Sequence, residues 1–308
     1  MKTKTLITDI KNMNSTIGRP SALFINSSNL IKSVALFVCL SQSSFLVAAG
    51  DAIDPASGNA VPSVPEIASQ GYKLAFSDEF KGPKLDEDKW QYRTDSKGSW
   101  AELPANVTVS NGLHIAVNKD QSQAKEVHSG GGIISKAEFQ YGYYEARFKG
   151  PAAGGWHTSF FTMHYNGKDA GNTSGREEID ICLQDSQLDT WGYKNTLHDW
   201  GAKLPDAAQH APNWIVEPGH APPHIRPDDP DYFKEAHIWG MEFTPKVVRF
   251  YFDGEWVGTM DATWFAHTPM SVWLTTAPAD LVPVDDSQLP SEAQFDYFRF
   301  FTKPGSQP

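Results

Sequence analysis

The sequence predicts an all-β protein whose main domain is a sandwich of two packed antiparallel sheets. Short runs of β-branched, aromatic and aliphatic residues recur along the 308 residues, and 24 Gly and 21 Pro are spread between them. The 40% hydrophobic and 12% aromatic content is enough for a sizeable core. No segment shows a sustained helical period with caps at both ends. Many short strands separated by turns are typical of two antiparallel sheets packed face to face.

Residues 1–49 are predicted to be a secretion signal rather than part of the fold. Basic residues precede an apolar run between Ser33 and Ala49 that is too short to span a bilayer, and Val47-Ala48-Ala49 supplies small residues for cleavage. We therefore expect a secreted or periplasmic protein. Residues 50–71 are rich in Ala, Pro, Ser and Gly and are predicted to form a flexible leader, so the folded domain is expected over residues 72–304.

Within that domain, short apolar or alternating runs bounded by turn residues predict the strands in order. They cover residues 73–76, 107–109, 113–117, 132–135, 143–148, 158–164, 178–183, 236–243, 247–252, 271–275 and 295–301. Asn111-Gly112 and Asp253-Gly254 lie between such runs and predict hairpins, because glycine accepts the positive φ of a tight turn. Residues 198–232 are expected to form a long loop with a functional role, and the prolines between His220 and His224 exclude a helical metal motif.

The charge of the chain excludes two classes of partner. Cleavage after Ala49 removes five basic residues and one acidic residue from totals of 26 and 37, which leaves 21 and 36 and a net charge of −15. Nucleic-acid binding needs Lys and Arg to replace counterions, so no nucleic-acid partner is expected. An acidic protein also has no attraction to an anionic membrane, and we expect a monomer. Cys182 would be the only cysteine left, so no intrachain disulfide is expected.

One predicted strand, from Glu177 to Asp185, alternates acidic and apolar residues. Successive strand side chains point to opposite faces, so Glu178 and Asp180 share one face while Ile179 and Ile181 share the other. Two neighbouring carboxylates disfavour each other's ionisation. The pair therefore indicates either a chemical role or a solvated strand edge.

Aromatic residues gather in sequence around this strand and suit a sugar-binding groove. Indole rings stack on the C–H faces of sugars, while carboxylates and imidazoles bond to the hydroxyls. The candidate substrate-binding residues are Trp100, Trp156, His157, Trp191, His198 and Trp214. The alternative is core packing, which the apolar neighbours of Trp239 favour, whereas Trp156 follows Gly154-Gly155 and is expected in the groove. His198 is expected on a strand beside the acidic one, where it either orients a carboxylate or sugar hydroxyl or is structural.

The order and spacing of several segments make the chain resemble glycoside hydrolase family 16, the laminarinase, lichenase, agarase and carrageenase group, over about residues 72–303. The matching segments are Ser77-Asp78-Glu79-Phe80, Asn111-Gly112-Leu113-His114-Ile115, Gly131-Gly132-Ile133-Ile134-Ser135-Lys136, Gly142-Tyr143-Tyr144-Glu145-Ala146-Arg147, Gly155-Trp156, Glu178-Ile179-Asp180-Ile181, His237-Ile238-Trp239-Gly240-Met241-Glu242, Phe250-Tyr251-Phe252-Asp253-Gly254 and Phe295-Asp296-Tyr297-Phe298.

This resemblance implies a concanavalin A-like β-jelly-roll with a concave substrate cleft, and retaining cleavage of a polysaccharide or oligosaccharide. A retaining site needs two carboxyl groups about 5 to 5.5 Å apart, one as nucleophile and one as acid/base. By resemblance, Glu178 would be the nucleophile and Asp180 would modulate it. No cofactor is required, although the resemblance would place a structural calcium ion at Asp296 with backbone oxygens near Glu79.

The acid/base position is where the chain departs from the family pattern. If the strand contains a β-bulge, which adds one residue, this position falls at Leu183, and without the bulge it falls at Cys182. Neither side chain is a carboxylic acid, and Asp185 would reach the position only after a change of register. Two functions therefore stay open: an exported hydrolase that is impaired at this position, and a carbohydrate-binding protein that keeps the cleft but lacks the general acid.

Overall fold

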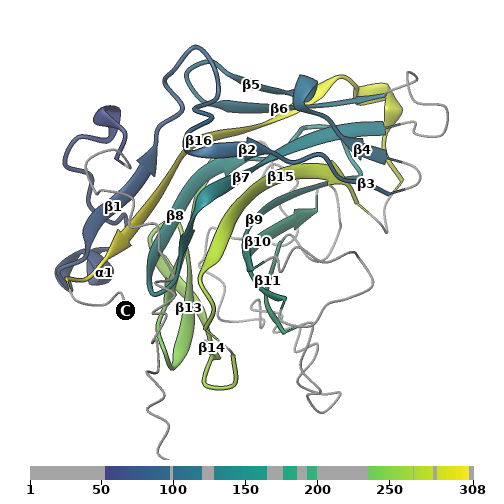
Figure 1. The fold of residues 1–308 in the computed structure, drawn as a ribbon. Coiled ribbons are helices and arrows are strands. Elements are labelled where there is room, and N and C mark those ends of the chain that lie inside the picture. The colour runs from purple at the N-terminus through teal and green to yellow at the C-terminus, as the bar shows by residue number, and fades with distance from the viewer. Residues whose placement is uncertain are drawn as a thin grey trace, which may run out of the picture. The chain divides into compact units, whose positions relative to one another are not determined.

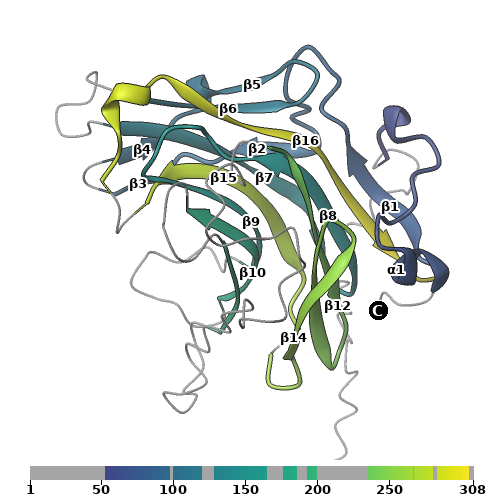
Figure 2. The same cartoon turned by 180° about the vertical axis from the view of Figure 1, so that it is seen from behind.

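The computed structural model describes residues 53–97, 100–119, 128–164, 176–185, 193–199, 235–265, 267–279 and 283–304. The predicted signal over residues 1–49 lies outside the described residues, as does most of the predicted loop after His198. The described residues are almost entirely strand, and Figures 1 and 2 show two antiparallel layers, so the predicted all-β sandwich is confirmed.

The first sheet is built around the 12-residue strand β16, which has neighbours along its whole length. Its strands, in spatial order, are β14 (Glu255–Asp261), β13 (Val247–Phe252), β12 (His237–Phe243), β8 (Gly142–Lys149), β16 (Ser291–Thr302), β6 (Leu113–Lys119) and β5 (Val107–Val109). β1 (Lys73–Asp78) pairs with the C-terminal half of β16, beside β6 on the same edge. The first and the last strand of the domain, β1 and β16, are therefore paired in one sheet.

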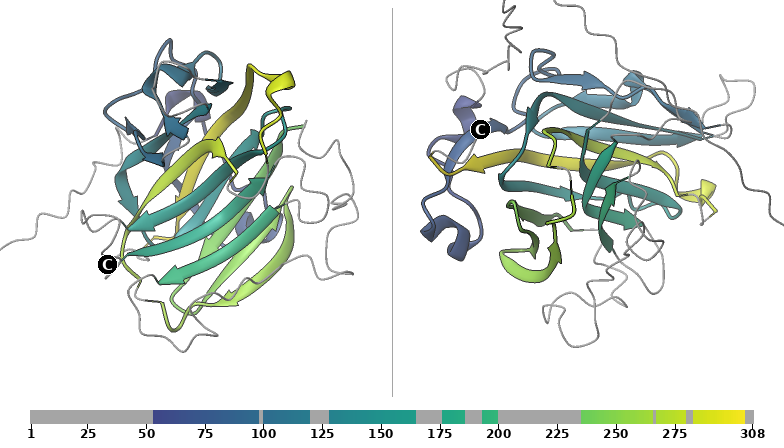
Figure 3. Two further views of the ribbon diagram at one scale, coloured as in Figure 1. Left: turned by 90° about the vertical axis from the view of Figure 1, so that its right-hand side faces the viewer. Right: turned by 60° about the horizontal axis from the view of Figure 1, so that its bottom comes forward.

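The second sheet carries the acidic strand close to one edge. Its strands, in order, are β11 (Tyr193–Asp199), β10 (Glu177–Asp185), β9 (Trp156–His164), β15 (Met270–Pro278), β7 (His128–Phe139) and β2 (Trp90–Tyr92). A short hairpin of β3 (Ser96–Lys97) and β4 (Trp100–Glu102) adds to β7, with β4 parallel to it. β6 and β7 also pair over two residues at their ends, which joins the two sheets. The left view of Figure 3 looks onto β15, β9 and β10.

Aromatic side chains fill the space between the sheets. Phe298 on β16 lies 5.9 Å from Phe160 on β9 and 6.0 Å from Phe139 on β7, measured between ring centroids. Alternate residues of the second sheet, such as Ile179 and Leu274, are fully buried in the same cluster. One face of the second sheet thus belongs to the core, and the residues between these buried ones occupy the opposite face.

The N-terminal segment differs from the predicted leader. It contains a 3-10 turn (η1, Pro55–Ser57) and a short helix (α1, Pro65–Ser69), and Val64 and Ile67 are buried against aromatic residues of the first sheet. The backbone N–H of Ser63 donates to the buried carboxylate of Glu145 at 2.8 Å. Composition predicted mobility because small and turn-forming residues dominate here, but two apolar side chains are enough to anchor the segment. We call residues 54–71 the N-terminal strap.

The predicted strands and hairpins correspond well to the structure. All eleven predicted runs fall on strands, and both predicted turns join paired strands, with φ of 54° at Asn111 and 45° at Asp253. The predicted runs do not cover β2, β3, β4, β11 and β14, which are short or mainly polar; of β11, only His198 was expected on a strand. Two further 3-10 turns are η2 (Pro104–Asn106) and η3 (Asp286–Gln288). Among the described residues, no helix has the length and apolar character needed to cross a membrane.

Candidate active site

The pairing of β10 with its two neighbours places Glu178 and Asp180 on the face opposite the core. Glu178 lies between Met163 on β9 and His198 on β11, and Asp180 lies between Phe161 and Thr196. Ile179 and Ile181, which alternate with the carboxylates, are buried in the core cluster. We call this surface of β9, β10 and β15 the carboxylate face. His198 lies on a strand beside the acidic one, as the sequence predicted.

A β-bulge interrupts β10 directly after Asp180. On β9, Asp180 pairs with Phe161 and Cys182 with the next residue, Phe160, so Ile181 is the extra residue. Such a residue loses its ladder partner, and here the side-chain amide of Asn195 on β11 donates to the carbonyl oxygen of Ile181. After the bulge, Leu183 pairs with Ser159, which is two residues from Phe161. The register therefore follows the bulged alternative and not the one that would use Cys182.

Asp180 and His198 form the central polar contact of the carboxylate face. His198 Nε2 lies 3.1 Å from Asp180 Oδ2, and the Asp180 side chain is only 1% exposed. Burial by itself lowers the pKa of His198, but the hydrogen bond to Asp180 and the charges of Asp180 and Glu178 outweigh it, so the pKa is raised. His198 therefore favours the imidazolium form, which donates to Asp180. Asp180 Oδ1 is buried without a hydrogen-bond partner among the described residues.

Glu178 is the more accessible of the two carboxylates, with a side chain that is 13% exposed. Arg176 Nη2 lies 3.4 Å from Glu178 Oε2, and Arg176 Nε contacts the sulfur of Met163 at 3.1 Å. The guanidinium thus bridges β10 and β9 on the carboxylate face. A nearby cation favours the ionised carboxylate, which is the form that can act as a nucleophile.

A cluster of nearly buried side chains, which we call the aromatic platform, continues the carboxylate face onto β9, β15 and β7, with Phe161 6% and Trp273 7% exposed. Phe161 and Trp273 stack with ring centroids 5.4 Å apart, within a cluster that also contains Met163 and Ile134. The guanidinium carbon of Arg93 lies 5.2 Å from the Trp273 ring. The Trp273 indole N–H is buried and has no hydrogen-bond partner among the described residues. Donors of this kind can serve a ligand hydroxyl.

The charge of Arg93 is balanced within the fold. Its Nε lies 2.8 Å from Asp95 Oδ2 and 2.5 Å from Glu102 Oε2, and the Glu102 side chain is fully buried. Arg93 and Trp273 are therefore held in a cation–π contact by two carboxylates. Glu102, an acidic residue in the same region, is committed to this pair.

The predicted substrate-binding residues have different positions in the structure. Trp156 is wrong as a groove residue: it is 0% exposed and packs with Val117 and Ala153, because it occupies the core phase of β9 together with Phe160. His157, in the opposite phase, is half-buried, and its backbone partner on β10 is Asp185. Trp100 is almost fully buried beside β7. Trp191 and Trp214 lie outside the described residues.

The core position predicted for Trp239 is confirmed. Its ring packs edge-on against Phe252 with a centroid separation of 4.5 Å, and it is almost fully buried.

The side chains of Glu79 and Asp296, where a calcium ion was predicted, are engaged with arginines. Both oxygens of Glu79 accept hydrogen bonds from Arg299, at 2.8 and 2.9 Å. Asp296 is paired with Arg147 and also accepts from the Gln294 amide. Within the described part of the chain, no group of three or more His, Cys, Asp or Glu side chains could hold a metal ion. The two carboxylates act here as partners of guanidinium groups.

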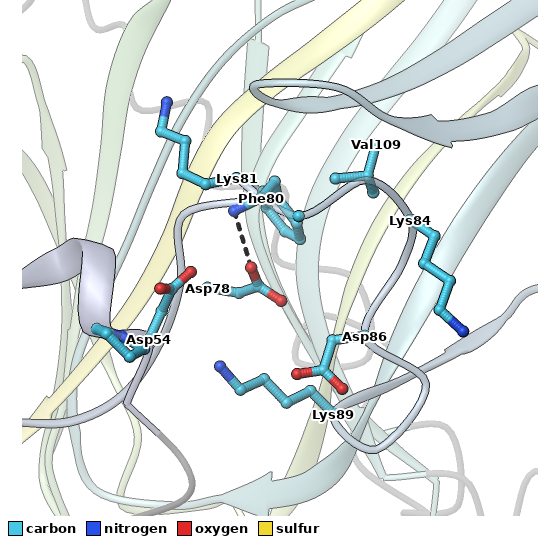
Figure 4. A pocket seen from close by; sticks show the side chains of 10 residues that line it. Asp54, Asp78, Phe80, Lys81, Lys84, Asp86, Lys89 and Val109 are labelled. Carbon is cyan, nitrogen blue, oxygen red and sulfur yellow. Dashed lines mark hydrogen bonds between the residues drawn. The ribbon is translucent and has the colours of Figure 1, made fainter.

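A pocket of about 230 Å³ lies between the N-terminal strap and the connection from β1 to β2 (Figure 4). Its lining residues are Asp54, Pro55, Asp78, Phe80, Lys81, Gly82, Lys84, Asp86, Lys89 and Val109. Asp78 accepts hydrogen bonds from the Phe80 N–H and the Trp90 indole, each at 2.8 Å, and burial raises its pKa. Lys89 donates to the Ser77 carbonyl. These groups stabilise the loop, and the pocket shares no residue with the carboxylate face.

Sequence reasoning missed Phe161, Met163, Trp273, Arg93 and Asn195. Alternation within each strand predicts which residues share a face, but it does not say which face belongs to the core. Trp273 and Arg93 also reach this surface only because β15 and the residues after β2 join the sheet from distant parts of the sequence. One signal in the sequence could have indicated Trp273: in β15, Ser271 and Trp273 alternate with the apolar residues Met270, Val272 and Leu274.

Comparison with known proteins gives one family. Residues 94–299 match the sequence profile of "Glycosyl hydrolases family 16". A kappa-carrageenase of Pseudoalteromonas carrageenovora is 28% identical over 234 residues, which cover 68% of this chain and 57% of that protein. A beta-glucanase of Acetivibrio thermocellus is 26% identical over 235 residues, covering 70% of this chain and 60% of that protein. The chain thus spans less than two thirds of the length of these curated relatives.

Solved structures show the same fold. The laminarinase catalytic domain of Thermotoga maritima superposes with a TM-score of 0.60 at 20% identity, covering 76% of this chain and all of that one. An endo-beta-1,3-glucanase of Pyrococcus furiosus gives a TM-score of 0.61 at 20% identity, covering 79% and 98%. At these identities the likeness concerns the fold.

Proposed function

Because the chain belongs to glycosyl hydrolase family 16, we propose that it is an exported, retaining glycoside hydrolase that cleaves within a β-linked polysaccharide of the β-glucan or galactan type. The observation that carries this proposal is the group of Glu178, Asp180 and His198 on one face of a β-sandwich. This face also holds an aromatic platform at Phe161 and Trp273, which suits the stacking of sugar rings.

In this proposal Glu178 attacks the anomeric carbon and forms a covalent glycosyl-enzyme. A second attack, from the side that the leaving group has vacated, releases the sugar with retained configuration. Asp180 and His198 form a hydrogen-bonded pair beside Glu178, and the raised pKa of His198 favours its imidazolium form. The unpartnered Asp180 Oδ1 is a buried acceptor for a donor such as a sugar hydroxyl. Hydrolysis is expected to be slow, because general acid catalysis typically contributes about 100- to 10,000-fold and Leu183 has no proton to give.

The relatives guide the choice of polysaccharide. One is named a kappa-carrageenase and another a beta-glucanase, and the solved structures include laminarinases. The predicted signal over residues 1–49 and the acidic mature chain fit a protein that meets its glycan outside the cytoplasm.

The test is to incubate the purified chain with laminarin, mixed-linkage β-glucan, agarose and kappa-carrageenan and to measure new reducing ends. We expect slow release from one polysaccharide, and loss of that release in Glu178→Gln, which keeps the size of the side chain but removes the nucleophile. Release that persists unchanged in Glu178→Gln would contradict the role of Glu178.

A second candidate is a carbohydrate-binding protein that does not cleave its ligand. The register that assigns Leu183 to the position after the bulge favours it. Titration calorimetry with oligosaccharides from the same four polysaccharides would then show binding, while no new reducing ends appear. Measurable cleavage that depends on Glu178 would reject this candidate.

A further inference from the structure

The position on β10 that follows Asp180 on the carboxylate face is held by a residue without an ionisable proton. After the bulge at Ile181, Leu183 pairs with Ser159 on β9 and with Lys194 on β11. Ser159 shares its strand face with Phe161, which pairs with Asp180. By register, residue 183 therefore continues the row of Glu178 and Asp180.

The described residues around this row supply no second carboxylic acid to replace it. Asp180 is buried and hydrogen-bonded to His198. The backbone partner of His198 on β10 is Glu178, so His198 and the bulge lie on opposite sides of Asp180 along the strand. Glu102 is committed to Arg93. Across the sheet from Leu183 the register continues through Ser159 to Thr275, whose hydroxyls are poor acids. Asp185, whose backbone partner on β9 is His157, comes two residues after Leu183 and is therefore one step of the strand alternation beyond that position.

We propose that this site transfers glycosyl groups to small anionic acceptors. The donors are glycosides whose leaving group departs without receiving a proton. The proposal rests on the nucleophilic role of Glu178 given above. In the first step a Glu178 carboxylate oxygen forms a bond to the anomeric carbon, and the bond from that carbon to the leaving oxygen breaks. The electron pair stays on the leaving group, which must therefore be the anion of an acidic alcohol or phenol.

The second step is also determined by the lack of a carboxyl group at position 183. Water must lose a proton as it attacks, and the residue at position 183 is not a base that could accept it. An anion such as azide or a carboxylate needs no deprotonation, so it attacks the anomeric carbon directly. The ester bond to Glu178 breaks, the carboxylate is restored, and the product is a β-glycosyl azide or β-glycosyl ester. Two displacements retain the configuration of the donor.

The experiment uses the full chain and the polysaccharide that it binds in the calorimetric panel. The probe is the matching 2,4-dinitrophenyl β-glycoside: laminaribioside for laminarin, cellobioside for mixed-linkage glucan, neoagarobioside for agarose or neocarrabioside for carrageenan. We expect dinitrophenolate release at least about 100-fold faster than cleavage of the polysaccharide, the lower bound of what a general acid contributes. The protein mass should rise by one disaccharide, and azide should accelerate turnover and give the β-glycosyl azide.

Four variants separate the possible origins of this behaviour. Leu183→Glu should gain polysaccharide cleavage by about 100- to 10,000-fold and lose the acceleration by azide. Leu183→Gln has the size of glutamate without its acidity, and it should behave like the unchanged chain. Glu178→Gln should lose dinitrophenolate release, and Asp185→Asn should leave all rates unchanged. Circular dichroism and thermal unfolding check that each variant is folded.

Several outcomes would overturn the proposal. Azide that changes neither the rate nor the product would show that water is activated by another group. Loss of polysaccharide cleavage in Asp185→Asn would identify Asp185 as the acid, and an α-glycosyl azide would exclude a covalent intermediate. If no polysaccharide binds, the proposed function itself fails, whereas binding without dinitrophenolate release or a mass change rejects the transfer reaction alone.

Discussion

His198 is the residue that links the two carboxylates electrostatically. It bonds to Asp180 and pairs in register with Glu178, and Arg176 lies on the other side of Glu178. Two acids and two cations thus alternate on the carboxylate face. A pair of adjacent carboxylates that would repel each other is tolerated because each has its own cationic neighbour.

The raised pKa of His198 predicts a pH-dependent contribution to stability. Burial lowers this pKa, but the hydrogen bond and charge of Asp180, with Glu178, raise it further than burial lowers it. The imidazolium contribution is therefore fully present below the unfolded-state pKa of about 6.5 and is lost as pH rises through the folded-state pKa. At pH 5.5, His198→Gln should lower the free energy of unfolding in urea by about 1.5 to 3 kcal/mol.

The same comparison at pH 9 is the control. The charge of His198 is lost as pH rises through its folded-state pKa, so the difference between the original chain and His198→Gln should shrink towards pH 9. A difference of equal size at both pH values would show that the ring contributes through packing instead of charge.

At the scale of elements, the bulge in β10 decides which residue follows Asp180 on the carboxylate face. The side-chain amide of Asn195 supports it by donating to the carbonyl of Ile181, which has left the strand ladder. Asn195 is buried, so no solvent replaces this donor. The position of residue 183 thus depends partly on a residue of the neighbouring strand.

Replacing Asn195 should destabilise the second sheet. Asn195→Leu leaves the Ile181 carbonyl buried without a donor, and the expected loss is about 1 to 3 kcal/mol in urea unfolding. Asn195→Asp keeps the shape but also lacks the donor, so it should lose at least as much at neutral pH. Little change in either variant would show that the amide does not hold the bulge.

The aromatic platform on β9 and β15 should contribute to glycan affinity. Trp273→Ala removes the ring that stacks on Phe161 and is expected to weaken oligosaccharide binding about tenfold, equivalent to about 1.4 kcal/mol. Calorimetry measures the change. Trp256→Ala is the matched control, because Trp256 lies on β14 of the other sheet and is 51% exposed. Equal losses in both variants would argue against a specific platform, and a folding defect is detected by thermal unfolding.

At the scale of the whole molecule, the N-terminal strap is part of the folded domain. Ile67 is fully buried against the first sheet, so Ile67→Ala should lower the free energy of unfolding by about 2 to 4 kcal/mol. Val61→Ala, at a position that is 66% exposed, should change it by less than about 0.5 kcal/mol. Chemical denaturation compares the two. A flexible leader would instead make both substitutions equally harmless.

Much of this architecture could be predicted from the sequence because strand signals are local. Alternation and the Asn-Gly and Asp-Gly turns identified eleven strands and both hairpins, and they also placed Glu178 and Asp180 together. The sequence could not predict on which face of β9 Trp156 lies, because its packing involves Val117 from another strand.

The strap and the aromatic platform depend on contacts between residues far apart in the chain. Ile67 meets Tyr251, and Phe161 meets Trp273, so composition alone indicated a mobile leader in the first case and gave no signal in the second. Whether Cys182 or Leu183 follows Asp180 on the carboxylate face was likewise open until the register of β10 was known.

The buried thiol of Cys182 allows the rate of local opening near the bulge to be measured. It lies in the core phase of β10, fully shielded, two residues after Asp180. A thiol reagent can react with it only when this part of the core opens, so the labelling rate under native conditions reports the free energy of local opening. A tightly bound oligosaccharide should slow that labelling. The chain thus carries, two residues after Asp180, an internal reporter of how often this part of the fold opens.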